Sequence, residues 1–289
     1  MDLRPDWTKP QYYVGTKLDL STNVCVDKNI NYAIDPSRYC NAAVCYGVLS
    51  DFYKISPYNI AIGYGLSELM IRIMQMFKYK GYRFTVLGNP TWEAVSVYQQ
   101  FLNIKEGHGV AYIANPNGND GSVLNVDQII ALSKQHKYLI VDEAYCDFAP
   151  KHSIIKYRPS NVIVLKTLSK SYASPGLRFG WCFADQAIIK SIQDIRPAQA
   201  MVGGVDKVLS DILDNISAHV DRMNNTKRII ESCYNHTPTN GNYVLLEPCK
   251  LTEQFITKPV GEYHRMALLD MVTYNEYIES TTSTNDPNR

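Results

Sequence analysis

Residues 167–181, TLSKSYASPGLRFGW, place several reactive side chains directly after the apolar run NVIVL. Lys170 lies among small hydroxyl residues, and Arg178 follows eight positions later. Four interpretations of Lys170 are open: an ordinary solvated lysine, a phosphate-loop lysine, a nucleic-acid contact, and an amine that bonds covalently to a cofactor. The neighbouring segments must decide between them.

A second reactive group occurs in residues 138–145, YLIVDEAY. Asp142 directly follows three apolar residues, and a carboxylate in such a place needs a cation or hydrogen bonds because its desolvation is costly. Asp142 could be a helix cap or part of an internal salt bridge, or it could pair with a cationic ligand group such as a protonated ring nitrogen. Lys170 lies at the end of the next predicted strand, so both side chains could face one cleft.

A third group, GYGLSE in residues 63–68, opens a predicted helix, where free backbone amides and the helix dipole favour an anion. It half-matches a dinucleotide fingerprint, but Glu68 stands where the third glycine belongs, so a phosphate site or a plain helix start is favoured over a NAD site. A lysine, a buried acid and a phosphate loop together meet the needs of pyridoxal phosphate. The lysine forms a Schiff base, the acid holds the pyridinium, and the loop holds the phosphate.

The elements that position these groups alternate along the chain. Predicted strands cover residues 59–65, 83–88, 109–114, 138–145 and 161–167, and predicted helices cover 66–79, 92–102 and 126–135. This alternation indicates an α/β fold with a mainly parallel central sheet and helices on both faces. From about residue 185 to about residue 234 the pattern is helical, and NYVLLEP then predicts one further strand.

Composition narrows the class of protein. The 289 residues include 45% hydrophobic and 20% charged residues, which is typical of a soluble globular protein, and the net charge of +1 disfavours a broad polyanion-binding surface. No apolar stretch reaches bilayer length, and the N-terminus lacks the apolar core of a secretory signal. Seven cysteines without a CxxC pair, and six histidines without HxxxH, predict no structural metal and no disulfide framework. We therefore expect a cytoplasmic protein that binds neither nucleic acid nor membrane.

The run from Thr167 to Ala173, with Gly176, resembles the lysine-site pattern of class II pyridoxal-phosphate aminotransferases. The whole chain resembles the histidinol-phosphate aminotransferase branch of fold type I, from about residue 20 to about residue 270. The resemblance implies the fold type I architecture with a shortened small C-terminal domain. It divides the chain into an N-terminal arm (1–35), a large α/β domain that binds pyridoxal phosphate (36–195) and the small domain (196–289).

The resemblance also implies roles for individual residues. Lys170 would carry the Schiff base and move protons, Asp142 would pair with the ring nitrogen, and Tyr145 would bind the ring's phenolic oxygen. Trp92 would stack on the ring, where relatives usually have tyrosine or phenylalanine. The residues expected around the phosphate are Gly65, Leu66, Ser67, Thr167, Ser169 and Arg178, with Tyr39 reaching in from a neighbouring subunit. Asn23 and Arg265 resemble contacts for the substrate carboxylate.

Structural alternatives accompany these roles. Trp92 and Tyr145 could fill the core, Arg178 could form a structural ion pair, and Arg265 could be a solvated strand residue. The chain also departs from the family at NPNGNDG, residues 115–121, where relatives have Asn-Pro-Thr-Gly. The residue expected to bind the ring oxygen aligns with Gly118, so either Asn117 takes over this contact or the contact is lost.

The resemblance implies an aminotransferase that moves an amino group between an amino acid or amine, possibly phosphorylated, and a keto acid. A homodimer is expected as the active unit. A decarboxylase of the phosphothreonine or phosphoserine type is the alternative enzyme, and a non-catalytic relative is the alternative from another class. Because the region after Tyr243 is short, the sequence leaves the substrate and the reaction type open.

Overall fold

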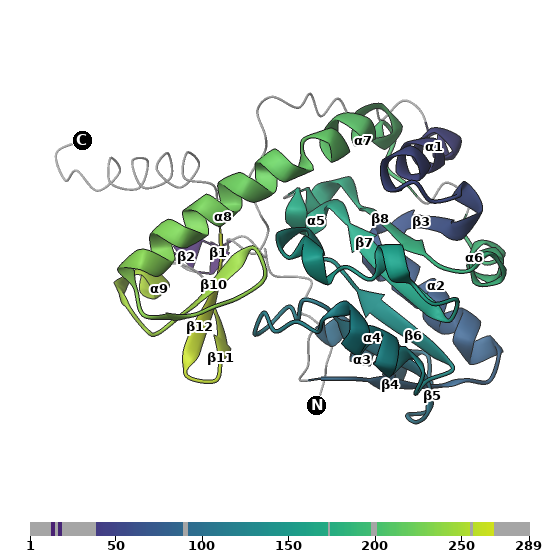
Figure 1. Ribbon diagram of the computed structural model, residues 1–289, viewed down its shortest axis with the longest axis horizontal. Helices are drawn as coiled ribbons and strands as arrows, with labels where there is room; N and C mark the ends of the chain where they lie inside the picture. The colour runs from purple at the N-terminus through teal and green to yellow at the C-terminus, as the bar shows by residue number, and fades with distance from the viewer. Residues whose placement is uncertain are drawn as a thin grey trace.

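The computed structural model describes residues 13–14, 17–18, 39–88, 92–172, 174–197, 201–254 and 257–268. In this part of the chain a six-stranded sheet and a four-stranded sheet form two lobes (Figure 1). The long helix α8 (Ile216–Cys233) runs from the larger lobe to the smaller one. A short antiparallel pair, β1 (Tyr13–Val14) and β2 (Lys17–Leu18), precedes both.

The larger sheet has the strand order β3-β8-β7-β6-β5-β4. Its strands are β3 (Ile60–Tyr64), β4 (Arg83–Val86), β5 (Gly109–Ala114), β6 (Tyr138–Asp142), β7 (Val162–Thr167) and β8 (Phe179–Phe183). Strands β4 to β7 are parallel, and β8 runs antiparallel to both of its neighbours. The predicted mainly parallel sheet is confirmed, whereas β8 was not predicted.

Helices cover both faces of this sheet, as predicted. Helices α2 (Gly65–Tyr79), α3 (Glu93–Phe101) and α6 (Gln186–Gln193) contribute to one apolar cluster. Helices α1 (Ala42–Tyr53), α4 (Val126–Ser133) and α7 (Val205–Asp214) contribute to the other. In β7, Val164 belongs to one cluster and Leu165 to the other, because successive side chains of a strand point to opposite faces. A strand that is buried on both faces typically has a continuous run of apolar residues in its sequence.

Short helices lie in the loops that connect these elements. They are η2 (Pro57–Asn59), η3 (Cys146–Phe148), η4 (Pro150–His152), η5 (Ile155–Tyr157), α5 (Leu168–Ser171) and η6 (Pro175–Leu177). Local capping fixes several of the helix starts. Asn125 and Gln128 form a capping box at α4, for example, in which each side chain bonds the other residue's backbone amide.

The smaller sheet is antiparallel, with the order β11-β12-β10-β9. Its strands are β9 (His236–Thr237), β10 (Tyr243–Leu246), β11 (Lys258–Val260) and β12 (Tyr263–Ala267), and the short helix α9 (Lys250–Gln254) lies between them in the chain. The sequence predicted only the strand at β10. The sheet packs on α8 through a third apolar cluster that includes Met223, Val244 and Met266.

Helix α7 falls within the range that we predicted for the small domain. Its apolar side chains, however, belong to the same cluster as Cys45 and Leu49 of α1. By packing, α7 is therefore part of the larger lobe, and we propose that the boundary falls between α7 and α8 rather than near residue 196. The rest of the predicted division stays a prediction.

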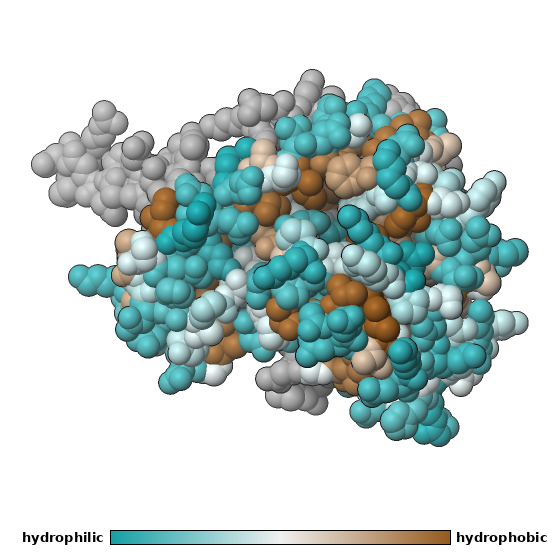
Figure 2. Space-filling model, viewed as in Figure 1, coloured by the Kyte–Doolittle hydropathy of each residue, from teal (hydrophilic) through white to brown (hydrophobic). Residues whose placement is uncertain are grey.

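The face shown in Figure 2 is mostly hydrophilic, with small hydrophobic patches separated by polar side chains. Among the described helices, none has the length and apolar composition needed to cross a membrane.

Candidate active site

The carboxyl ends of three parallel strands meet at a cavity of about 500 Å³. The last residues of β5, β6 and β7, which are Ala114, Asp142 and Thr167, all line it. The predicted site residues that line it are Leu66, Ser67, Trp92, Asp142, Tyr145, Thr167, Ser169, Lys170, Arg178 and Arg265. Residues from segments that are up to 199 positions apart in the chain (66 to 265) thus face one space.

Lys170 reaches the cavity because a strand turns directly into a helix. Thr167 ends β7 and caps α5, since its Oγ1 accepts a hydrogen bond from the backbone amide of Ser169 at 3.2 Å. The hydroxyls of Thr167 and Ser169 also bond each other at 3.0 Å. Lys170 follows on this single turn, and its Nζ lies 5.6 Å from the centroid of the Tyr145 ring.

Asp142 is 5% exposed and accepts two hydrogen bonds. The Tyr112 hydroxyl donates to Oδ2 at 2.7 Å, and the backbone amide of Ala144 donates to Oδ1 at 2.9 Å. Burial raises the pKa of this carboxyl, while both hydrogen bonds and the charge of Lys170 act in the opposite direction without cancelling the effect. A bound cation would therefore stabilise the ionised carboxylate.

Sequence reasoning did not single out Tyr112, although the register of the sheet brings it to Asp142. Ala114 lies opposite Asp142 in the β5–β6 pair, and Tyr112 is two residues earlier on the same face. Such diagonal neighbours are within reach of a long aromatic side chain. Tyr112 can be recognised as a neighbour of Asp142 only from the register of β5 and β6.

Tyr145 follows β6 and links the two lobes. Its hydroxyl accepts a hydrogen bond from Nη2 of Arg265, on β12, at 3.1 Å. Burial tends to raise the pKa of Tyr145, but the charges of Lys170 and Arg265 outweigh this effect, so the pKa lies below its usual value. Tyr145 is thus a phenol held between two cations.

The loop that was predicted to bind phosphate brings Arg178 to the start of α2. Gly65 has φ = +71°, and a Cβ on it would lie 2.5 Å from Nη2 of Arg178. A Cβ on Gly180 would lie 2.8 Å from the backbone N of Leu66, so two glycines allow the strand ends and the guanidinium to come together. Within the described residues no carboxylate pairs with Arg178, whose Nη1 donates to the carbonyl of Pro175 at 2.8 Å.

Glu68 does not oppose an anion at this loop, although it lies in the first turn of α2. Its Oε1 is 2.6 Å from Nε of Arg72, and its Oε2 accepts from the backbone amide of Tyr64 at 3.1 Å. The charge is therefore neutralised inside the protein. The start of α2 with Arg178 makes a positive site that suits a phosphate.

Two further predicted residues, Asn117 and Tyr39, lie away from the cavity. Asn117 is buried, its Oδ1 accepts from the amide of Asn119 at 2.8 Å, and it does not line the cavity, where Gly118 and Asn119 lie instead. The idea that Asn117 replaces the missing ring-oxygen contact finds no support in this arrangement. Tyr39 is 72% exposed and outside the cavity. Asn23 lies outside the described residues.

The family model named Aminotransferase class I and II matches residues 98–250, which is more than half of the chain. The chain belongs to this family. Histidinol-phosphate aminotransferase of Thermococcus gammatolerans is 28% identical over 51% of this chain and 49% of that protein. The enzyme of the same name from Brachyspira hyodysenteriae is 23% identical over 82% of this chain and 77% of that protein. The first match spans only about half of the relative's length.

Solved structures of the family share the fold. Histidinol-phosphate aminotransferase from Sinorhizobium meliloti, in complex with pyridoxal-5'-phosphate, superposes with a TM-score of 0.70 at 19% identity and covers 86% of this chain and 85% of that one. L-threonine-O-3-phosphate decarboxylase from Porphyromonas gingivalis superposes with a TM-score of 0.68 at 17% identity, covering 85% and 92%. This aminotransferase-family chain therefore has the fold type I architecture.

The cavity of this family member also contains a lysine that sequence reasoning missed. Lys258 lines it from β11, directly opposite Arg265 in the β11–β12 pair. Its Nζ lies 2.7 Å from Oε1 of Glu93, at the start of α3 beside Trp92. This exposed ion pair joins the small sheet to the larger lobe at the cavity. It was missed because neither strand was predicted.

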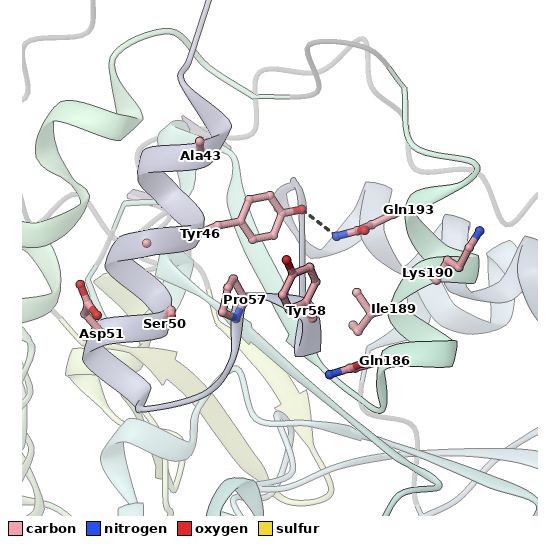
Figure 3. A pocket seen from close by; sticks show the side chains of 11 residues that line it. Ala43, Tyr46, Ser50, Asp51, Pro57, Tyr58, Gln186, Ile189, Lys190 and Gln193 are labelled. Atoms are coloured by element: carbon pink, nitrogen blue, oxygen red, sulfur yellow. Dashed lines mark hydrogen bonds between the residues drawn. The ribbon is translucent and has the colours of Figure 1, made fainter.

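A second cavity of about 700 Å³ lies between α1, η2 and α6 (Figure 3). Of the predicted site residues that the structure describes, none lines it. Nε2 of Gln193 donates to the Tyr46 hydroxyl at 3.3 Å and to the carbonyl of Ile60 at 3.2 Å, so its amide is already engaged. We assign no chemistry to this cavity.

Proposed function

We propose that the protein is a pyridoxal-phosphate-dependent aminotransferase. It would move an amino group from an amino acid or amine, possibly phosphorylated, to a keto acid. The convergence of Lys170, Asp142 and Arg178 on one cavity carries this proposal, because it brings together an amine, a buried acid and a positive site that suits a phosphate. Family membership and the named relatives support it.

The residues present fit the cofactor. Its phosphate would lie at the start of α2 against Arg178, with the hydroxyls of Ser67, Thr167 and Ser169 nearby. Its ring nitrogen would meet Asp142, and Trp92 would lie against the ring face. When bound, the cofactor supplies an electron sink for the substrate's Cα.

The chain's own groups would then hold and move protons. Lys170 would hold the cofactor through Nζ and, once released by the incoming amine, take the proton from Cα. Asp142 would keep the ring nitrogen protonated, as its own buried carboxylate needs a cation. Tyr145, whose hydroxyl already meets Arg265, would bind the ring oxygen, and Arg265 would orient the substrate carboxylate.

A homodimer and a cytoplasmic location complete the proposal. The exposed Tyr39 supports the first, because it precedes α1 and lies outside the cavity of its own chain, so its side chain would serve the phosphate site of a partner. Composition and sequence pattern support the second.

A decarboxylase is the second candidate, favoured by the likeness to the Porphyromonas gingivalis enzyme and by two adjacent cations, Lys258 and Arg265, at the cavity. A single assay separates the two reactions. Purified protein loaded with pyridoxal phosphate is mixed with amino acids and O-phosphorylated amino acids, and both pyridoxamine phosphate and carbon dioxide are followed. The proposal predicts pyridoxamine phosphate. Carbon dioxide without pyridoxamine phosphate would establish the decarboxylase, and a protein that binds no pyridoxal phosphate would contradict both.

A further inference from the structure

Arg265 lies on the face of an aromatic ring from the neighbouring strand. In the β10–β12 pair Leu245 lies opposite Arg265, so Tyr243, two residues earlier, is its diagonal neighbour on the same face. The central carbon of the guanidinium is 3.9 Å from the centroid of the Tyr243 ring. At this distance the positive charge is attracted to the negative face of the ring.

Tyr243 is fixed in place from several sides. It is fully buried, and its hydroxyl donates to the carbonyl of Asn117 at 2.7 Å. A Cβ on Gly241 would lie 2.4 Å from Cε1 of Tyr243, so the ring occupies the space that a side chain there would need. The ring of Tyr145 packs edge-on against it, with centroids 5.7 Å apart and an interplanar angle of 85°. The ring under Arg265 therefore has little freedom to move.

This support determines which edge of Arg265 remains available. Nη2 donates to the Tyr145 hydroxyl, and among the described residues the buried Nε has no hydrogen-bond partner. Arg265 lines the cavity, so the N–H groups of its guanidinium that do not bond Tyr145 could donate to a ligand acceptor there. A carboxylate matches the planar fork of a guanidinium.

We propose that Tyr243 is a positioning residue for Arg265. Its ring holds the guanidinium so that one nitrogen binds Tyr145 and the remaining edge receives the substrate carboxylate. Tyr243 does not line the cavity, so it would set the preference for carboxylate-bearing donors without touching them. The inference rests on the proposed function in one respect, namely that Arg265 meets the substrate carboxylate.

The first test uses two stable cofactor adducts that differ by one carboxylate: N-phosphopyridoxyl-L-alanine and N-phosphopyridoxyl-ethylamine. Calorimetry measures their affinities for the cofactor-free protein. Tyr243→Met fills a similar volume without an aromatic face, and we expect it to lose about tenfold in affinity for the alanine adduct alone, as the loss of a buried cation–π contact predicts. Tyr243→Phe keeps the ring and should keep the preference. Equal losses for both adducts, or none, in Tyr243→Met would overturn the proposal.

Arg265→Met provides the reference for this test. It should remove the preference with Tyr243 intact, and adding Tyr243→Met to it should cause no further loss of preference, because both changes remove one interaction. Additive losses would contradict the proposal. If Tyr243→Met does not fold, the Tyr243→Phe variant carries the test. Loss of the carboxylate preference in Tyr243→Phe, to the same extent as in Arg265→Met, would contradict the proposal.

The second test needs neither cofactor nor turnover. Besides Tyr243, the groups facing the Tyr145 hydroxyl are Arg265, Lys170 and Asp142, and the first two lower its pKa. Ultraviolet pH titration of the cofactor-free protein, with Tyr145→Phe to assign the signal, reports on Arg265 directly. We expect Tyr243→Met to move the midpoint upward by roughly 1 pH unit, the lower end of the effect of one adjacent charge. An unchanged midpoint would contradict the proposal even if the protein proves to be an aminotransferase. If the Tyr145 midpoint shifts but the protein binds neither adduct, the proposed function is rejected. The inference that Tyr243 positions Arg265 would still hold.

Discussion

At the scale of single residues, the site depends on a carboxyl that is buried at a cost to the fold. Asp142 is nearly inaccessible, and its two hydrogen bonds do not restore its usual pKa. A group with this property is typical of functional sites, where the ligand supplies the missing charge. The same property predicts opposite effects on stability and activity when Asp142 is changed.

Asp142→Asn should raise the melting temperature of the cofactor-free protein. A carboxyl whose folded pKa is raised destabilises the folded state above that pKa, and this penalty disappears as the pH falls through the raised value. The gain should therefore be largest above the raised pKa and shrink as the pH falls towards the usual pKa of an aspartate. Thermal melts at several pH values measure it. Asn can still bond Tyr112 and Ala144, so lost packing is not expected to hide the effect.

Activity should change in the other direction. Asp142→Asn removes the anion that would keep the ring nitrogen protonated, so turnover should fall by roughly 100-fold or more. A variant that is both destabilised and fully active would contradict the role of Asp142.

At the scale of elements, the phosphate site is made by backbone that only glycine allows. Gly65→Ala would place a Cβ against the Arg178 guanidinium and force a left-handed alanine, which costs roughly 1–2 kcal/mol in the free energy of unfolding. We expect the affinity for pyridoxal phosphate to fall by about tenfold or more as Arg178 moves. Denaturant unfolding and absorbance titration measure the two effects.

Gly176 provides the matched control. It is exposed, a Cβ on it would meet nothing within 4 Å, and its φ is not positive. Gly176→Ala should leave both quantities near wild type. If the two variants bind the cofactor equally well, Arg178 and the start of α2 do not form the phosphate site.

A buried ion pair fixes the segment that carries Lys170. Nζ of Lys166 on β7 lies 2.5 Å from Oδ1 of Asp147, and the Ser171 hydroxyl donates to Oδ2 at 2.6 Å. Burial lowers the pKa of Lys166, but the charge of Asp147 and further acidic groups outweigh this effect and hold the pKa above its usual value. Asp147 thus bonds a residue on each side of Lys170 in the sequence, Lys166 before it and Ser171 after it.

Asp147→Ala should destabilise the fold by roughly 3–5 kcal/mol, because it leaves a buried ammonium unpaired. The double variant Lys166→Met with Asp147→Ala should recover most of that loss, since it removes both charges. Urea unfolding of wild type, both single variants and the double variant measures the coupling. If the double variant is as unstable as Asp147→Ala, the unpaired charge of Lys166 is not the cause of the lost stability.

The elements that sequence patterns predicted best are the buried parallel strands and the amphipathic helices. Strand β5 was predicted over its full length, and β7 and α2 to within one residue at each end, because long apolar runs and helical periodicity are strong signals. Strands β8, β11 and β12 were missed. Residues 179–183 followed an irregular turn, and residues 258–267 mix Lys, Pro, Gly and Glu in short segments, so neither region gives a clear periodic pattern.

The same difference explains which site residues could be predicted. Lys170, Asp142 and Arg178 come from motifs that are visible in the chain itself. Tyr112, Tyr243 and Lys258 reach the site or its support only through strand register, which sequence patterns do not give. The prediction for Asn117 lost support because the turn directs Asn119 and Gly118 to the cavity.

At the scale of the whole molecule, two lobes build one site. The small sheet supplies Arg265 and Lys258, and Arg265 bonds Tyr145 of the larger lobe. If Tyr39 completes the site of a neighbouring subunit, as we propose, the active unit also needs two chains. This part of the account can be tested by mixing inactive partners.

Tyr39→Ala and Lys170→Ala should each have low activity when purified separately. Mixed under conditions that allow subunit exchange, they should regain activity, because one site of each mixed dimer would combine an intact Lys170 with an intact Tyr39. Sedimentation should show dimers throughout. A mixture no more active than the sum of its parts, or an active monomer, would contradict the shared site.

The most direct test of the central claim is to find the lysine that holds the cofactor. Purified protein is incubated with pyridoxal phosphate, reduced with borohydride, digested and analysed by peptide mass spectrometry, with Lys170→Ala treated in parallel. The account predicts a phosphopyridoxyl group on Lys170 and its loss in the variant. A group on any other lysine, or an unmodified Lys170 in the wild type, would contradict it.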